Sequence, residues 1–309
     1  MRAVLCTRYG PPEVLRLAEV ERPTPRRNQI CIRIFATAVT VSDCVIRGLR
    51  APRRYRLLLR LLAGWNAPRR SILGMVLAGD VESVGRNVTS FKEGDPVFGM
   101  SRWVVGAYAE AVCWPVSTLL APRPQNLSYE EAAALPYGGL LAVHCLRKAK
   151  IQPGQRVLVY GASGAIGTAA VQLARHLGAG VTGVCSTTNL KLVESLGAEA
   201  VLDYTREDFT RRGERYDLIF DAVGKRKSAS AMRDAGRALT TGGACISIDD
   251  DFPRLTRQDL DLLKRLAESG ALKPVIDRRY RLEEIVEAHR YVELGHKKGN
   301  VIVTVGPRS

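Results

Sequence analysis

The sequence predicts an α/β protein in which a β-rich domain precedes a doubly wound parallel sheet. Short apolar runs separated by Gly and Pro fill the first 117 residues, which is typical of strands joined by turns. From about residue 156, strand-like runs alternate with helix-like segments, which is the pattern of parallel βαβ units. The length of 309 residues also favours about two domains.

The N-terminal region carries the first group of predicted strands. Residues 30–39 (ICIRIFATAV) alternate in polarity, and residues 72–85 are apolar with glycine breaks. Residues 93–100 and 106–115 continue the series, and the N-terminus itself has the pattern of a strand followed by a turn. We therefore expect a β-rich domain here.

Residues 47–70 interrupt these strands with a segment rich in Arg and Leu. On a helical wheel its leucines share one broad face and its arginines lie opposite, which is typical of an amphipathic helix. Three interpretations are open: a lid over a substrate cleft, plain domain surface, or a site for a membrane surface or another anionic partner. A lid would suit hydrophobic substrates.

From residue 118 the pattern changes to helices and alternating elements. Ser128 and Glu131 have the spacing of a capping box, so residues 128–149 are expected to be helical. The predicted strands that follow are 156–161, 181–186, 200–204, 216–224, 242–249 and, near the C-terminus, 300–305. The predicted helices are 168–179, 189–198, 230–239, 258–268 and 282–292. The alternation up to residue 251 predicts an open doubly wound sheet.

Composition limits the class of protein. Apolar residues make up 46% and charged residues 25%, as in ordinary globular proteins. The seven cysteines are odd in number and lack paired spacing, which argues against a disulfide framework and a thiolate zinc knuckle. No run approaches the roughly 20 apolar residues that cross a bilayer, and the N-terminus lacks a signal-peptide core. We expect a cytoplasmic protein without stable membrane insertion.

The net charge of +15 is compatible with nucleic acid, a membrane surface or a phosphorylated cofactor as partner. The arginines are spread along the chain, and no basic motif interleaved with aromatic residues is present. A nucleic-acid partner is therefore not expected.

The most informative motif is the glycine series Gly161, Gly164 and Gly167, which lies between a predicted strand and a predicted helix. This context strengthens a pattern that is weak by itself. Glycines allow a tight turn and close approach of phosphates, which the first-turn amides and the helix dipole then hold. The motif predicts a dinucleotide site; a packing turn without ligand is the alternative.

The end of the second strand indicates which dinucleotide binds. An NAD site usually has Asp or Glu there, about 20 residues beyond the glycines, to bond the ribose 2′-hydroxyl. This chain has Cys185–Asn189 (CSTTN) with no acid, followed by Lys191. Hydroxyls and an ammonium group suit a 2′-phosphate, which a carboxylate would repel. The sequence therefore favours NADPH, although these residues also suit a helix cap.

The order of a strand-rich N-terminal region, GASGAIG, CSTTN, LGAEAVLDYTREDF and YDLIFDAVG resembles the medium-chain dehydrogenase/reductase superfamily. More narrowly it resembles the zinc-free quinone oxidoreductase and NAD(P)-dependent alcohol dehydrogenase-like branch. The resemblance implies a GroES-like β-rich catalytic domain and a Rossmann doubly wound parallel-sheet domain, with the cofactor between them. The expected domains are 1–117 (GroES-like), 118–251 (Rossmann, NADPH-binding) and 252–309 (return to the catalytic domain).

The resemblance also implies cofactor-binding residues. Those expected at the pyrophosphate are Ser163, Gly164, Ala165, Ile166 and Gly167. Ser186 and Tyr204, with Lys191 as a weaker candidate, are expected at the adenosine 2′-phosphate. Ala222 and Gly224 would face the ribose and nicotinamide. The residues expected to return to the cofactor from the C-terminal region are His296, Lys297 and Lys298, for which a solvated charged turn is the alternative.

A metal ion is not expected. Zinc-dependent relatives have a Cys after an early strand and a Gly-His-Glu later, where this chain has Val41-Ser42-Asp43 and Gly74-Met75-Val76. Met75 and Val76 cannot replace an imidazole or a carboxylate ligand. The four-cysteine structural zinc lobe is also missing.

The expected substrates follow from the missing Lewis acid. Quinones and α,β-unsaturated carbonyl compounds accept hydride without strong carbonyl polarisation, so a hydrophobic substrate of this kind is favoured. A hydrogen bond to the developing oxyanion is then required. The candidate donors are Thr40, Ser42, Arg47, Tyr55 and Tyr137. None is assigned, because many quinone reductases have Asn and Tyr where this chain has Thr40 and Val45, and the family's usual Thr near the nicotinamide appears as Leu141.

Other functions stay open at this point. They are a zinc-free alcohol or aldehyde oxidoreductase, a non-catalytic NADPH-binding redox sensor, and a basic protein associated with membranes or nucleic acid. The chain is expected to be a monomer or a homodimer, because the short stretch between Asp249 and Gln258 replaces a longer loop and strand of relatives.

Overall fold

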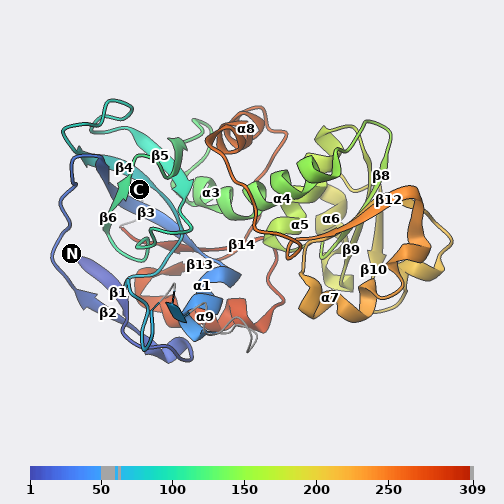
Figure 1. Ribbon diagram of the computed structural model, residues 1–309, viewed down its shortest axis with the longest axis horizontal. Helices are drawn as coiled ribbons and strands as arrows, with labels where there is room; N and C mark the ends of the chain where they lie inside the picture. Colours follow the sequence, from blue (N-terminus) through green and yellow to red (C-terminus); the bar gives the residue numbers. More distant parts are fainter. Residues whose placement is uncertain (50–59, 62–63, 307–309) are drawn as a thin grey trace. The chain divides into compact units, whose positions relative to one another are not determined.

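A computed structural model describes residues 1–49, 60–61 and 64–306. The chain divides into two compact units (Figure 1). Unit 1 contains Met1–Pro136 and Ile276–Ser309, and unit 2 contains Tyr137–Val275. Residues 50–59 and 62–63 of the Arg/Leu segment, Tyr55 among them, lie outside the described residues.

Unit 1 is built on a seven-stranded sheet with the order β13-β14-β3-β4-β5-β7, in which β6 also pairs with β3. β13 and β14 pair in parallel, and the other pairs are antiparallel. Two further strands, β1 and β2, form an antiparallel pair. The strands of unit 1 are β1 (Arg2–Cys6), β2 (Leu15–Glu19), β3 (Gln29–Val39), β4 (Val76–Val84), β5 (Pro96–Met100), β6 (Ala111–Pro115), β7 (Leu119–Pro122), β13 (Ile276–Arg281) and β14 (Asn300–Thr304).

Short helices cover this β-structure. The capping box predicted from Ser128 and Glu131 is confirmed, and an equivalent box at Thr40 and Asp43 starts the helix after β3. The helical elements of unit 1 are α1 (Val41–Gly48), α3 (Tyr129–Ala134), α9 (Ile285–Leu294) and the 3₁₀ turns η1 (Pro12–Val14) and η5 (Leu282–Glu284). Trp114 and Tyr108 are fully buried in the core of this unit.

Unit 2 contains the predicted parallel sheet, with the strand order β10-β9-β8-β11-β12 (Figure 1). All four neighbouring pairs are parallel. The strands are β8 (Arg156–Tyr160), β9 (Gly180–Cys185), β10 (Ala200–Asp203), β11 (Tyr216–Asp221) and β12 (Leu239–Ser247). The helical elements are α4 (Pro136–Ala149), α5 (Ala165–His176), α6 (Leu190–Ser195), α7 (Lys225–Met232), α8 (Arg257–Glu268) and the 3₁₀ turns η2 (Thr187–Asn189), η3 (Phe209–Arg211) and η4 (Ala235–Ala238).

The strand order determines where a ligand can bind. The chain fills the sheet outward from β8, first through β9 and β10 and then, on the other side, through β11 and β12. The direction of winding reverses between β8 and β11. In open parallel sheets, ligands bind beside the carboxyl ends of the strands at such a switch point.

The chain passes from one unit to the other after Pro136 and after Val275, whereas the domain boundaries expected from the sequence are at residues 117/118 and 251/252. Residues 118–136 belong to unit 1, since β7 pairs with β5 and α3 packs on β3 and β4. Residues 252–275 belong to unit 2, where Leu263 of α8 packs against Gly139 of α4.

One predicted helix differs from the structure. Residues 230–239 were expected to form one helix, whereas α7 begins at Lys225 and β12 begins at Leu239. The start of α7 is fixed early because Ser228 donates to the buried carboxylate of Asp221. β13 was not predicted, because its sequence IDRRYR lacks the alternation of a half-buried strand.

Candidate functional site

The glycine turn between β8 and α5 contains three glycines with different spatial requirements. Gly161 has a φ of +79°, and a Cβ there would lie 2.3 Å from the Val223 side chain. A Cβ on Gly167 would lie 2.1 Å from the carbonyl oxygen of Gly161. A Cβ on Gly164 would meet only that same carbonyl, at 3.5 Å. The first and third glycines thus serve close packing, and Gly164 leaves its surroundings open for a ligand.

The N-terminus of α5 is suited to an anion. Gly164 is its N-cap residue and supplies no side-chain hydrogen bond to the first-turn amides. Such amides, together with the helix dipole, bind phosphate groups. Ser163 is half-buried beside this turn, and Ala165, Ile166 and Gly167 form the first buried turn of the helix. The predicted pyrophosphate residues therefore occupy one continuous turn.

Asn189 connects the glycine turn to the end of β9. Its side-chain nitrogen Nδ2 lies 3.1 Å from Ser163 Oγ and 3.1 Å from Ser186 Oγ, and it donates to both. Asn189 is buried, with 6% of its surface exposed. A hydroxyl oxygen that accepts a hydrogen bond still has its own hydrogen to donate. Ser163 and Ser186 can therefore each donate to an acceptor such as a phosphate.

The ends of β9 and β10 lie side by side. The backbone nitrogen of Tyr204 donates to the carbonyl of Cys185 at 3.1 Å, so Tyr204 follows β10 close to Ser186. Tyr204 is 48% exposed and packs 6.3 Å, between ring centroids, from Tyr160. Lys191 is exposed on α6. These are the residues expected from the sequence at an adenosine 2′-phosphate, and that assignment stays a prediction.

A carboxylate also lies near these strand ends. Asp203 is buried, and it accepts from Thr187 Oγ1 and from the nitrogen and hydroxyl of Thr205. These donors lower the pKa of Asp203, with the hydroxyl of Thr187 as the largest cause, so the group is ionised. Arg206 Nε lies 3.5 Å from the same carboxylate and its side chain is 74% exposed. Arg206 was not among the predicted site residues, although its exposed guanidinium suits a phosphate.

The turn after β11 is held by Asp221. One carboxylate oxygen accepts from the backbone nitrogens of Val223 and Gly224, at 3.0 and 3.1 Å. The other accepts from the hydroxyls of Ser228 and Ser247, at 2.7 and 2.8 Å. Asp221 was not among the predicted site residues, although its place at the end of a buried strand was a usable signal.

This buried carboxylate fixes the backbone around Ala222 and Gly224, both expected at the nicotinamide ribose. Gly224 has a φ of +99°, and a Cβ there would meet the carboxylate of Asp249 at 2.5 Å. The backbone nitrogen of Ala222 donates to the carbonyl of Tyr160 at 3.0 Å. The turn after β11 is therefore joined to the end of β8, at the switch point of the sheet.

Tyr137 also belongs to unit 2. Its neighbour Gly138 packs so closely on the first turn of α5 that an added Cβ would lie 2.1 Å from the carbonyl oxygen of Ala165. Tyr137 is half-buried. The backbone that follows Tyr137 thus lies against the first turn of α5.

The candidate donors of unit 1 lie at the start of α1. Thr40 is 3% exposed, and its hydroxyl donates to Asp43 Oδ2 at 2.6 Å. Arg47 is fully buried and donates to the carbonyl of Gly10 and to the carboxylate of Glu293. Thr40 and Arg47 already serve the packing of α1. Ser42 is half-buried in the first turn of the same helix.

The three C-terminal residues of the prediction lie in unit 1, between α9 and β14. His296 is exposed, and Lys297 and Lys298 are half-buried. The backbone nitrogen of Lys298 donates to Asp277 at 2.9 Å, and Lys297 Nζ donates to the carbonyl of Gly299. These contacts fix the loop and give it two cationic side chains.

The part of the chain that the structure describes has no cluster of three or more His, Cys, Asp or Glu residues that could hold a metal ion. Met75 and Val76, at the positions of zinc ligands in relatives, are buried apolar side chains. Among the described residues, no helix is both long and apolar enough to cross a bilayer.

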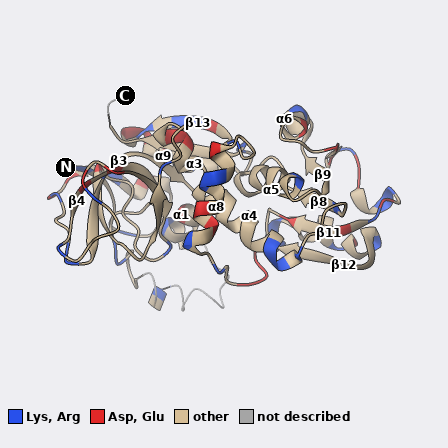
Figure 2. Ribbon diagram, turned by 90° about the horizontal axis from the view of Figure 1, so that it is seen from above, with Lys and Arg blue, Asp and Glu red and all other residues tan. Residues whose placement is uncertain are grey.

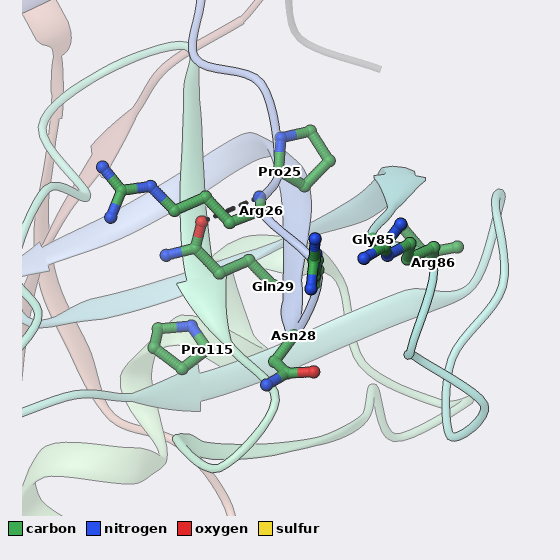
Figure 3. Close-up of a pocket in the computed structure, with 9 residues that line it drawn as sticks. Pro25, Arg26, Asn28, Gln29, Gly85, Arg86 and Pro115 are labelled. Carbon is green, nitrogen blue, oxygen red and sulfur yellow. Dashed lines mark hydrogen bonds between the residues drawn. The ribbon is translucent and has the colours of Figure 1, made fainter.

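A separate surface pocket of about 880 Å³ lies in unit 1 and contains none of the predicted site residues (Figure 3). Its lining residues are Pro25, Arg26, Arg27, Asn28, Gln29, Val84, Gly85, Arg86 and Pro115. Lys and Arg residues are not confined to this pocket, since they occur on elements of both units (Figure 2). The high net charge therefore does not by itself locate a site.

Comparison with known proteins connects the whole chain to oxidoreductases. Residues 26–125 match the family described as alcohol dehydrogenase GroES-like domain, and residues 196–303 match zinc-binding dehydrogenase. The chain is 32% identical to the 2-methylene-furan-3-one reductase of Solanum lycopersicum, over 98% of this chain and 79% of the relative. It is 31% identical to the chloroplastic NADPH-dependent alkenal/one oxidoreductase of Arabidopsis thaliana, with the same shares covered.

A solved structure agrees with these relatives. The quinone oxidoreductase of Coxiella burnetii matches 99% of this chain and 99% of its own, with a TM-score of 0.83 and 27% identity. The GroES-like and Rossmann-type folds expected from the sequence are thereby confirmed.

Proposed function

This chain belongs to the medium-chain dehydrogenase/reductase superfamily, in its quinone oxidoreductase-like branch, and we propose that it is an NADPH-dependent reductase of quinones or α,β-unsaturated carbonyl compounds. The family is one of oxidoreductases that use a nicotinamide cofactor, which supplies a hydride when bound. The phosphorylated form of the cofactor and the substrate class are the proposed part.

The residues present fit the cofactor. The open backbone at Gly164 and the uncapped start of α5 accept a pyrophosphate. A single observation carries the choice of NADPH: buried Asn189 donates to Ser163 in the turn after β8 and to Ser186 at the end of β9, where an NAD site has a carboxylate. The charged groups nearby, Lys191 and Arg206, add positive potential for a 2′-phosphate.

The substrate class rests on the donor set and on the relatives. The two plant relatives are named for reduction of an enone-type furanone and of alkenals and alkenones, and the solved neighbour for quinones. These acceptors need a hydrogen bond at the developing oxyanion rather than a metal ligand set. Tyr137 and Ser42, whose side chains are both half-buried, are the proposed donors. The hydroxyl of Thr40 donates to Asp43, and Arg47 binds the carboxylate of Glu293.

The test is steady-state oxidation of NADPH and NADH over a panel of quinones, enones and aldehydes. The proposal predicts the highest kcat/KM with NADPH and a quinone or an enone. Faster turnover of simple aldehydes than of either class, or a preference for NADH, would contradict it.

A further inference from the structure

Two cysteines that are far apart in the sequence lie directly opposite one another in unit 1. Cys31 of β3 pairs with Cys113 of β6 in antiparallel register. Three residues to either side, Ile34 donates to Glu110 and Val116 donates to Asn28 through backbone hydrogen bonds of 2.9 and 3.1 Å.

These flanking bonds determine the type of pair. In an antiparallel ladder, hydrogen-bonded and non-hydrogen-bonded pairs alternate along the strands. The two cysteines lie three residues from a hydrogen-bonded pair on both sides, so they form a non-hydrogen-bonded pair. In such a pair the Cα atoms are about 4.5 Å apart, and both side chains project from the same face. A disulfide spans Cα separations of about 4.4–6.8 Å, so no strand has to move for the sulfurs to bond.

We propose that Cys31 and Cys113 form a thiol-oxidation site that closes to a cross-strand disulfide when the protein meets a hydroperoxide. The more accessible thiol, Cys113, is half-buried, whereas 2% of Cys31 is exposed. The thiolate of Cys113 attacks one peroxide oxygen, which gives a sulfenic acid and, from hydrogen peroxide, one water. The sulfur of Cys31 then displaces the sulfenic hydroxyl as a second water. Both thiol protons end in water, the two sulfurs are oxidised and the peroxide is reduced.

The surroundings of the two sulfurs support this assignment of roles. Hydrogen bonding between the thiols lowers the pKa of Cys113 and, with burial and the nearby Glu82 carboxylate, raises the pKa of Cys31. Cys31 Sγ lies 3.6 Å from the carbonyl of Pro23 and 3.7 Å from Glu82 Oε2. The low-pKa, accessible sulfur is the one that oxidants attack first, and its neighbour resolves it.

The strand registers bring no other two cysteines opposite each other in the described part of the chain. Cys6, Cys185 and Cys245 pair with Leu15, Asp203 and Ile219. Cys245 is exposed on β12, so it is the natural site for bonds between molecules and a suitable control.

To test this, the full chain is treated with hydrogen peroxide, and its tryptic peptides are identified by mass spectrometry without a reducing agent. Trypsin cleaves after Arg27, Arg33 and Arg102, which places Cys31 and Cys113 on different peptides. We expect the intact mass to fall by two hydrogens per chain and the two peptides to be joined until dithiothreitol is added. The midpoint of thermal unfolding should rise in the oxidised form, because the bond constrains the unfolded chain.

Variants locate the bond. Cys31→Ser and Cys113→Ser should abolish the joined peptides, and Cys245→Ser should keep them. If Cys31 and Cys113 of the wild type are each oxidised to sulfinic or sulfonic acids and no joined peptides form, the proposal is overturned. The same follows if the joined peptides link two molecules, or if they form only after the chain is denatured.

Discussion

The side-chain amide of Asn189 donates to the hydroxyl of Ser163 across 3.1 Å, joining the turn after β9 to the turn after β8. The same nitrogen also reaches Ser186, so one buried side chain orients hydroxyls from two strand ends. In the proposed NADPH site, the hydroxyl of Ser186 takes the place of the carboxylate of an NAD site.

Removal of the Asn189 amide should weaken NADPH binding without unfolding the protein. Asn189→Ala loses two hydrogen bonds, each worth about 1 kcal/mol, so the Kd for NADPH should rise by up to about thirtyfold. Ser195→Ala is the matched control, because Ser195 is exposed on α6 and donates only to the carbonyl of Leu192 among the contacts described. Calorimetric titration measures the Kd for NADPH of each variant. Equal values for Asn189→Ala and Ser195→Ala would show that Asn189 has no part in binding.

A carboxylate at the end of β9 should change the cofactor preference. In Ser186→Asp the new negative charge repels a 2′-phosphate and can accept from a ribose hydroxyl, so the ratio of kcat/KM for NADPH over NADH should fall at least about tenfold. Ser186→Asn introduces a similar volume without charge and serves as control. An undiminished NADPH affinity in Ser186→Asp would be incompatible with a phosphate at this position.

Replacement by alanine should have different effects at two glycines of the same turn: it should weaken cofactor binding at Gly164 and lower the Tm at Gly167. Gly164→Ala has room for its methyl group, so the fold should keep its Tm, but the methyl group would keep the pyrophosphate from the backbone and raise the Kd at least about tenfold. Gly167→Ala places a Cβ 2.1 Å from a backbone oxygen, and its Tm should fall by about 4 °C or more. Equal effects of the two variants on Tm would refute this division of roles.

Substitution of Thr40 should affect stability, whereas substitution of Tyr137 should affect kcat. Thr40→Ala removes the N-cap of α1 and should lower stability by about 1 kcal/mol, with little change in kcat. Tyr137→Phe should instead lower kcat about tenfold or more at unchanged Tm, because it removes a proposed oxyanion donor. Thermal melts and steady-state kinetics on both variants check this, and the reverse pattern would assign the donor role to Thr40.

Asp43 should make stability depend on pH. Burial raises its pKa from 3.8 to about 6 in the folded protein, although hydrogen bonds from Thr40 oppose the shift. A raised folded-state pKa means that the contribution of this group to stability is complete below about pH 3.8 and is lost as the pH rises through about 6. Asp43→Asn lacks this titration, so the stability of the wild type relative to the variant should fall by about 3 kcal/mol between these limits. Denaturant unfolding at several pH values measures it, and a constant difference would contradict the shift.

Much of the fold followed from local pattern, and what was missed depends on contacts distant in sequence. The glycine turn was predictable because Gly161, Gly164 and Gly167 lie between a clear strand and a clear helix. β13 was not, since an edge strand of charged residues is stabilised by its pairing with β14 and lacks an apolar face of its own.

The same distinction applies to the site. Ser186 could be located from its spacing to the glycines, but the structure was needed to show that Asn189 orients it. Likewise, cysteine spacing gave no sign of the Cys31–Cys113 pair, because the register of β3 and β6 creates it.

A crystal structure grown at saturating NADPH is the most direct test of the central claim. It should show the pyrophosphate at the backbone of Gly164–Gly167 and the 2′-phosphate within hydrogen-bonding distance of Ser186. Nucleotide density at another place, or a protein without nucleotide beside the carboxyl end of β8 under those conditions, would contradict the account.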